Sequence, residues 1–184
     1  MAEMITGLDI RILTYVQEHF QTAPATAFWK FITLFGDYGL FWIALTLLLV
    51  IWSRTRRTGC AVMISLALDF MVVNLIIKKV VARPRPYDTF SHIGLLIDRQ
   101  SDFSFPSGHT AASFACALVL VRMLPKKYGV PLVILACLIS FSRIYLGVHY
   151  PSDVFAGFLI GLLTSQIGYY VVQRLQYRSD AIDS

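Results

Sequence analysis

The sequence predicts an all-α integral membrane protein, a helical bundle of five to six transmembrane helices with interfacial helices at its N-terminus. Charged residues make up only 15% of the 184 residues, whereas hydrophobic residues reach 57%; soluble domains carry roughly 25% charged residues. A soluble protein of this length could not cover its surface with so little polar material. The apolar residues also gather in charge-poor runs that approach the ~20 residues needed to cross a bilayer.

The first 37 residues predict helices that lie on the membrane surface. Apolar residues recur at helical spacing from Leu8 to Phe20, with polar residues between them. The segment 23–35 is apolar but short. We therefore interpret residues 1–37 as two interfacial helices or one shallow hairpin, with a sixth span as the alternative.

Five charge-poor runs are the predicted spans of a single membrane domain. They cover Tyr38–Ser53, Thr58–Ile77, Gly108 to about Leu124, Tyr128–Ser142 and Val154–Gln173. Several are shorter than the ~20 residues of a full span, so we expect flanking residues to complete them. Residues 38–173 thus form the predicted bundle, and residues 174–184 a cytoplasmic tail.

Basic residues in the connections predict the orientation. They form three clusters: Arg54, Arg56 and Arg57; Arg122, Lys126 and Lys127; Arg174 and Arg178. With five spans, all three clusters fall on one side, as the positive-inside rule expects of the cytoplasmic face. Connections 81–107 and 143–153 then face outward. We expect a multi-pass protein of the bacterial inner membrane. The net charge of +5 reflects these clusters, so no nucleic-acid partner is expected, and the oligomeric state is left open.

The outward connections and the helix ends beside them carry polar residues that converge at the membrane edge. These are Lys78, Arg85, Ser107, Gly108, His109, Arg143, His149 and Asp153. Three cations suit an oxyanion with several charged oxygens, and phosphate is the commonest. Ser107 and Gly108 open a predicted helix, whose free backbone N–H groups and dipole also favour phosphate. An anion site follows from these features.

Two histidines indicate that this anion site also supports a reaction. Asp153 lies four residues after His149 and can hold one ring nitrogen, which leaves the other nitrogen free to attack phosphorus. His109, on a different helix, can protonate the leaving alkoxide. The residues show no metal-ligand spacing, so we expect neither a metal nor another cofactor.

The spacing of these residues resembles that of the type 2 phosphatidic acid phosphatase superfamily. The three motifs are Lys78-x6-Arg85-Pro86, Pro106-Ser107-Gly108-His109 and Ser142-Arg143-x5-His149-x3-Asp153. The resemblance implies that His149 forms a phosphohistidine, that Asp153 orients it and that His109 is the general acid. The implied phosphate-binding residues are Lys78, Arg85, Ser107, Gly108 and Arg143.

The resemblance also implies the substrate class. We expect a metal-independent phosphatase that acts on the terminal phosphate of a membrane lipid at the extracytoplasmic face. The candidate lipids are undecaprenyl diphosphate, phosphatidylglycerophosphate and phosphatidic acid. A non-catalytic lipid-phosphate binding protein or a lipid transporter is the alternative. Binding alone does not require the His149–Asp153 spacing, and the inverted repeats or broken helices usual in transporters are not apparent in the sequence.

Two charged residues lie outside the motifs. Arg83 does not match the spacing and is interpreted as a loop or headgroup contact. Asp69 lies near the middle of the second predicted span, half a helical turn from Lys78 on a straight α-helix. We therefore expect it to stay away from the phosphate and to form an interhelical hydrogen bond.

Overall fold

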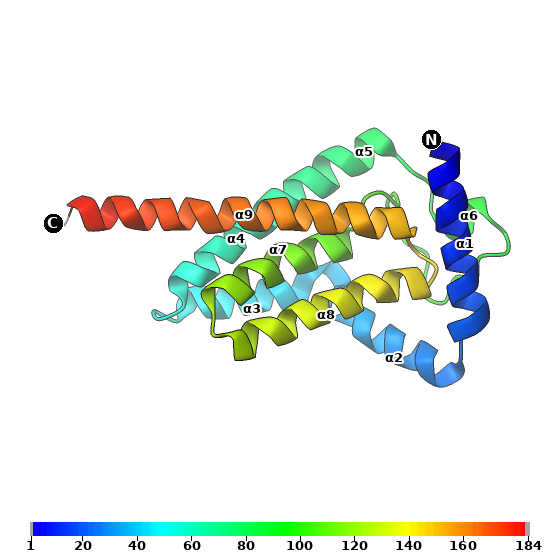
Figure 1. Ribbon diagram of the computed structural model, residues 1–184, viewed down its shortest axis with the longest axis horizontal. Helices are drawn as coiled ribbons and strands as arrows, with labels where there is room; N and C mark the ends of the chain where they lie inside the picture. The colour runs from blue at the N-terminus through cyan, green and yellow to red at the C-terminus, as the bar shows by residue number, and fades with distance from the viewer. Residues whose placement is uncertain (1, 183–184) are drawn as a thin grey trace.

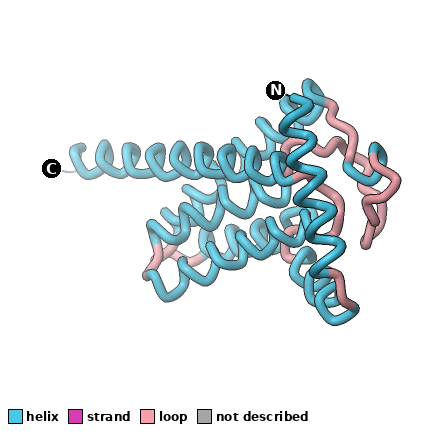
Figure 2. Tube along the Cα trace, turned by 45° about the vertical axis from the view of Figure 1, so that its right-hand side comes forward, coloured by secondary structure: helices cyan, strands magenta, loops and turns pink. Residues whose placement is uncertain are grey.

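The computed structural model describes residues 2–182, and the side chains of residues 4–177. Every regular element in this part of the chain is helical (Figures 1 and 2). The elements are α1 (Ala2–Phe20), α2 (Ala23–Leu34), the 3-10 turn η1 (Asp37–Gly39), α3 (Leu40–Ile51), α4 (Arg56–Phe70), the π-helical segment η2 (Met71–Ile77), α5 (Lys78–Val81), α6 (Pro86–Thr89), α7 (Gly108–Met123), α8 (Lys126–Tyr145) and α9 (Pro151–Ile182).

Helix α7 is the centre of the bundle, and it packs against α4, α8 and α9. Small side chains, among them Ala111 and Ala115, are fully buried along it. A Cβ atom on Gly157 of α9 would lie 2.6 Å from the Ser107 carbonyl oxygen, and one on Gly161 would lie 2.6 Å from that of Ala111. Small residues on both helices therefore let α7 and α9 approach closely, as in other membrane bundles.

The predicted all-helical membrane bundle is confirmed. Four helical segments are long and apolar enough to cross a membrane, and the shorter apolar helix Gly108–Met123 lies among them. The four segments are Ala23–Ile51, Arg56–Thr89, Lys126–Tyr145 and Pro151–Tyr177.

The first of these segments includes α2, which the sequence places at the membrane surface. Helix α2 has 12 residues and α3 has 12, and neither crosses a bilayer alone. The η1 turn, with Gly39 at φ +67°, joins them into one apolar segment of 29 residues. The division at residue 37 stays a prediction, and the helix of the predicted tail at 174–184 continues α9 to Ile182.

The two ends of the bundle differ in what they carry. Helix α1 lies across one end, beside the α8–α9 connection and the long loop between α6 and α7 (Figures 1 and 2). The α3–α4 and α7–α8 connections and the C-terminal part of α9 lie at the other end. The three basic clusters of the sequence are therefore at the end of the bundle opposite to α1.

Candidate active site

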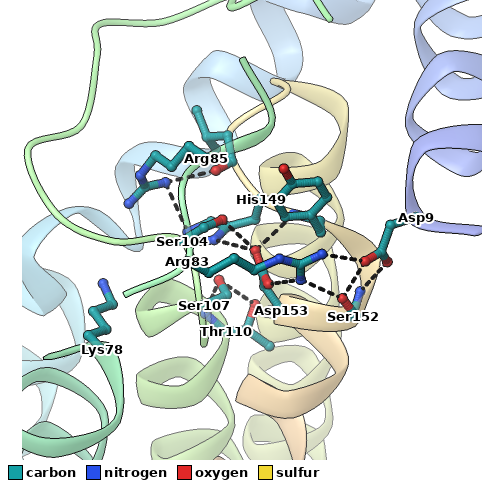
Figure 3. A network of polar contacts seen from close by, with 12 residues as sticks. Asp9, Lys78, Arg83, Arg85, Ser104, Ser107, Thr110, His149, Ser152 and Asp153 are labelled. Carbon is teal, nitrogen blue, oxygen red and sulfur yellow. Dashed lines mark hydrogen bonds and ion pairs between the residues drawn. The ribbon is translucent and has the colours of Figure 1, made fainter. Parts of the chain in front are cut away.

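Helices α5, α7, α8 and α9 and the connections after α5 and α8 bring the predicted site residues to the end of the bundle near α1. Figure 3 shows five of them: Lys78, Arg85, Ser107, His149 and Asp153. Arg85 follows the end of α5, where Pro84 and Pro86 prevent the helix from continuing. Ser107 is the N-cap of α7, and its hydroxyl oxygen accepts a hydrogen bond from the Thr110 hydroxyl at 3.1 Å. Arg143 lies in the last turn of α8, His149 in the α8–α9 connection and Asp153 in the first turn of α9.

His149 and Asp153 form a buried pair. The His149 side chain is 2% exposed and the Asp153 side chain 0%. The distance from His149 Nδ1 to Asp153 Oδ2 is 3.5 Å, longer than a direct hydrogen bond. Asp153 Oδ2 accepts from the Ser104 hydroxyl at 2.5 Å and from the Tyr150 backbone N–H at 3.0 Å. The carboxylate is therefore held in place and faces the imidazole.

The opposite nitrogen of His149 faces cations. Its Nε2 lies 3.4 Å from Arg85 Nη1, which also donates to the Val148 carbonyl at 2.8 Å. Burial, together with the positive charges of Arg85, Arg143 and Lys78, lowers the pKa of His149 well below its usual value of 6.5. The imidazole is therefore neutral at physiological pH. A ring with its proton on Nδ1, facing Asp153, directs the Nε2 lone pair towards the cations.

Lys78 and Arg85 meet at the carboxylate of Asp102, in the loop before α7. Arg85 donates from Nη2 to Asp102 Oδ1 at 2.5 Å and from Nε to the Asp102 carbonyl at 2.9 Å. Lys78 pairs with the other carboxylate oxygen. Burial opposes ionisation, but the hydrogen bonds and charges of the two cations outweigh it and lower the pKa of Asp102 to about 2. Lys78 and Arg85 thus already converge on a single anionic group.

The remaining predicted residues lie on the other side of Lys78. A Cβ atom on Gly108 would be 3.7 Å from Lys78 Nζ, so the α7 backbone begins directly beside this amine. His109 Nε2 lies 2.9 Å from Asp37 Oδ1 in η1. Arg143 is 1% exposed and donates from Nη1 to the Thr33 hydroxyl at 2.6 Å. Its Nε has no hydrogen-bond partner among the described residues.

A cavity of about 940 Å³ connects the loop between α6 and α7 with apolar residues of the bundle. Lys78, Gly108 and His109 line this cavity, and so do Gln100 and Asp102 of the loop. Its remaining wall contains apolar residues of α3 and α4, which include Ile43, Leu66 and Phe70. The site therefore combines a polar group of cations and histidines with an apolar extension.

The structure joins the eight predicted residues in two adjoining groups. Arg85, His149 and Asp153 belong to the buried network, whereas Lys78, Gly108 and His109 line the cavity. Ser107 links the two, because its backbone N–H donates to the Asp153 carbonyl at 3.0 Å. Arg143 lies on the side of the site that faces α2, where it contacts Thr33. Among the described residues, no group of three or more His, Cys, Asp or Glu side chains is placed to hold a metal ion.

The interpretation of Arg83 as a loop or headgroup contact is wrong. Its Nη1 donates to Asp153 Oδ1 at 2.6 Å and to the Ser152 hydroxyl at 2.8 Å, and its Nη2 donates to Asp9 Oδ2 at 2.9 Å. Ala82 ends α5 in the left-handed conformation, at φ +46°, and Arg83 lies directly beyond this turn, on the α9 side. The doubled Arg-Pro in the first motif was the available signal.

The expected half-turn offset of Asp69 from Lys78 is wrong, and the expected interhelical hydrogen bond is not found among the described residues. Asp69 and Lys78 line the same cavity, and no hydrogen-bond partner reaches Asp69 Oδ1 among the described residues. The seven residues Met71–Ile77 between them are π-helical. Hydrogen bonds from i to i+5 place more residues in each turn than an α-helix has. The half-turn offset of a straight α-helix therefore does not apply.

Asp37, Asp102 and Ser104 also contact predicted site residues, and Asp9 contacts Arg83 and Ser152; no pattern in the sequence identifies these four residues. Asp102 and Ser104 lie just before the second motif, in a loop without periodicity. Asp9 and Asp37 lie in the N-terminal region, more than 40 residues before Lys78 or His109. No local pattern connects such distant positions.

Known proteins resemble the chain over most of its length. A sequence profile of the PAP2 superfamily matches residues 58–177. The undecaprenyl-diphosphatase of Sulfolobus acidocaldarius is 34% identical over 159 residues, which cover 86% of this chain and 76% of that protein. The decaprenylphosphoryl-5-phosphoribose phosphatase of Mycobacterium tuberculosis is 34% identical over 171 residues, with 91% and 92% covered. The crystal structure of Aquifex aeolicus LpxE superposes with a TM-score of 0.77 at 29% identity, covering 88% and 94%.

Proposed function

The chain belongs to the PAP2 superfamily and is a membrane lipid phosphatase, and on this premise we propose that it removes the terminal phosphate of a polyprenyl diphosphate through a phosphohistidine on His149. The observation that carries the mechanism is the placement of His149 between Asp153, 3.5 Å from Nδ1, and Arg85, 3.4 Å from Nε2. A neutral imidazole with a carboxylate behind it and cations in front of it is arranged for attack on an anionic phosphorus centre.

Phosphate binding is the first step of the proposed reaction. Lys78, Arg85 and Arg143 supply positive charge to the phosphate oxygens, and this charge also stabilises the transition state. Ser107 and Gly108 contribute the start of α7, where free backbone N–H groups and the helix dipole favour an anion. Gly108 has no side chain, so the phosphate can approach the backbone closely beside Lys78.

Phosphoryl transfer follows. The Nε2 lone pair of His149 attacks phosphorus, an N–P bond forms, and the bond from phosphorus to the leaving oxygen breaks. The proton on Nδ1 faces Asp153, whose carboxylate stabilises the positive charge that the ring acquires. His109, in its protonated form, donates a proton to the leaving oxygen of the lipid. Asp37, 2.9 Å from His109 Nε2, holds the ring that delivers this proton.

Water completes the cycle. His109, now neutral, removes a proton from a water molecule that attacks the phosphorus of the phosphohistidine. The N–P bond breaks, inorganic phosphate leaves, and both histidines return to their initial state. The products are inorganic phosphate and a lipid with one phosphate fewer.

The substrate proposal rests on the relatives and on the cavity. Two relatives carry the names of polyprenyl lipid phosphatases, one for undecaprenyl diphosphate and one for decaprenylphosphoryl-5-phosphoribose. The cavity extends from Lys78 and His109 along apolar residues of α3 and α4. Such a shape fits a headgroup at the bundle end and a long apolar chain directed into the bilayer.

We propose further that the site faces away from the cytoplasm. The basic clusters at 54–57, 122–127 and 174 lie at the opposite end of the bundle (Figure 1). By the positive-inside rule, that end is the cytoplasmic one. In this orientation α1 lies at the extracytoplasmic surface of the membrane that the bundle spans, at the level of the lipid headgroups.

Phosphate release by the purified protein in detergent tests the proposal. The panel contains undecaprenyl diphosphate, phosphatidylglycerophosphate and phosphatidic acid, each with EDTA present. We expect turnover that EDTA leaves unchanged and that is fastest with undecaprenyl diphosphate. Faster release from either glycerolipid contradicts the substrate, and loss of activity in EDTA contradicts the metal-independent mechanism. Binding of the lipids by folded protein without any release contradicts the enzyme.

Replacing Asp102 with Asn should strengthen the binding of inorganic phosphate. Phosphate and the Asp102 carboxylate compete for Lys78 and Arg85. Because Asp102 is 47% exposed, the expected gain is modest, about three- to tenfold in the inhibition constant. The pKa of Asp102 is about 2, so the carboxylate stays charged, and keeps competing, until the pH falls towards that value. A gain should thus be present both at pH 5 and at pH 8.

The matched control for this variant is Asp98→Asn, which removes the same charge from the same loop. Competitive inhibition by phosphate is measured for wild type and both variants. Weaker inhibition of Asp102→Asn contradicts the competition and instead makes Asp102 a residue that holds the two cations in place.

A further inference from the structure

Asp9 is a buried carboxylate on α1, the helix that lies across the end of the bundle (Figure 1). It is 3% exposed, whereas its neighbour Leu8 is 60% exposed. Asp9 Oδ1 accepts from the Ser152 backbone N–H at 2.8 Å, and Oδ2 accepts from the Ser152 hydroxyl at 2.5 Å. Ser152 is the second residue of α9, so the negative charge of Asp9 lies at the positive end of that helix.

Arg83 connects Asp9 to Asp153 (Figure 3). Its Nη2 donates to Asp9 Oδ2 at 2.9 Å and its Nη1 to Asp153 Oδ1 at 2.6 Å. The guanidinium carbon lies 3.6 Å from the centre of the Tyr150 ring, which supports the plane of the group from one side. The planar fork of an arginine can hold two carboxylates at once in this way.

The charges of this network matter for His149. Arg83 carries one positive charge, and Asp9 and Asp153 carry one negative charge each, so the three together retain one negative charge. Without Asp9, Arg83 and Asp153 would form a neutral pair. The cations Arg85, Arg143 and Lys78 also surround the imidazole and oppose positive charge on the ring, and Asp102 pairs with two of them. A net negative network beside Nδ1 is what offsets them.

On the basis of the proposed function, we propose that Asp9 and Arg83 are positioning residues of the reaction. They hold Asp153 with Oδ2 towards His149 and keep its negative charge available when the ring acquires positive charge during phosphoryl transfer. Neither residue touches the phosphate. Through Asp9, the surface helix α1 becomes part of the catalytic machinery of the bundle.

Asp9→Asn tests this role, because asparagine keeps an oxygen for the Ser152 N–H but loses the charge and the oxygen that accepts from Arg83 Nη2 and the Ser152 hydroxyl. Couplings within one hydrogen-bond network reach about 1.4 kcal/mol, which corresponds to a factor of ten in rate. We therefore expect kcat to fall about tenfold while KM stays within about twofold. Glu18→Gln is the matched control, since it removes the same charge from an exposed position of α1 and should leave both constants unchanged.

A double-mutant cycle separates positioning from simple stabilisation. In an Asp153→Asn background, the carboxylate that Asp9 supports is already neutral, so adding Asp9→Asn should cause no further loss. Losses that multiply in the double variant overturn the proposal, because a purely structural role acts regardless of Asp153. Unchanged kcat in Asp9→Asn, or a change confined to KM, overturns it as well.

Arg83→Lys serves if Asp9→Asn fails to fold. Lysine keeps the charge but lacks two separate nitrogens for Asp9 and Asp153, so we expect the same loss of kcat at unchanged KM. The His149→Ala variant distinguishes the two levels of failure. If that variant retains turnover, the phosphohistidine mechanism itself is wrong. If it is inactive while Asp9→Asn and Arg83→Lys both match wild type, only the role of Asp9 and Arg83 is wrong.

Discussion

Replacing His149 with Ala should reduce phosphate release by about 10⁴-fold or more, because the attacking nitrogen is lost and water cannot take its place in the buried site. His149 Nε2 lies beside Arg85. The other ring nitrogen, Nδ1, is 3.5 Å from the fully buried carboxylate of Asp153. Alanine leaves Lys78, Arg85 and Arg143 in place. Affinity for the lipid should therefore survive while turnover is lost.

The measurement is phosphate release together with trapping of a phosphoenzyme from ³²P-labelled substrate. Wild type should yield an acid-labile, alkali-stable label, as expected of an N–P bond, and His149→Ala should yield none. The control is His92→Ala, which replaces an exposed histidine of the loop between α6 and α7 and should behave as wild type. A label that persists in His149→Ala would assign the nucleophile to another residue.

Replacing His109 with Asn should lower kcat by about 10²- to 10⁴-fold for substrates with a poor leaving group. The reason is that an alkoxide cannot leave without a proton, whereas a phosphate or a nitrophenolate leaves more readily. The loss should thus be largest for phosphatidic acid and smaller for undecaprenyl diphosphate. For p-nitrophenyl phosphate, the loss in the rate of the first step, phosphoryl transfer to His149, should be the smallest of the three.

The second half of the cycle gives an independent readout of the same variant. His109 also activates the water that hydrolyses the phosphohistidine, so His109→Asn should release a burst of nitrophenolate and then accumulate labelled enzyme. His149→Ala should show neither the burst nor the label. An equal loss of the first-step rate, measured as kcat/KM or as the burst rate, with all three leaving groups would exclude His109 as the general acid.

The membrane class and the candidate site are largely readable from the sequence. Charge-poor runs indicate the apolar helices because a bilayer excludes charge from its core. The motifs predict eight site residues, because phosphate chemistry uses cations, a helix start and histidines. The structure brings these residues together at one end of the bundle, in two adjoining groups that Ser107 links.

The errors arise where distant parts of the chain meet. Asp69 is placed wrongly because a π-helical segment changes the register between it and Lys78. Arg83 is placed wrongly because its partners, Asp9 and Asp153, lie 74 and 70 residues away in the chain. The division at residue 37 stays a prediction, and the η1 turn joins α2 and α3 into one apolar segment.

The sequence by itself determined that this protein lies in a membrane and which residues are candidates for its site, since hydropathy and motif spacing are local properties of the chain. Only the tertiary structure decided which groups share a proton or a charge, because hydrogen bonds depend on distances of about 3 Å between segments that folding brings together. The network from Asp9 through Arg83 to Asp153 is the clearest case. The motifs point only to Asp153, and its connection to Asp9 through Arg83 exists only in the folded bundle.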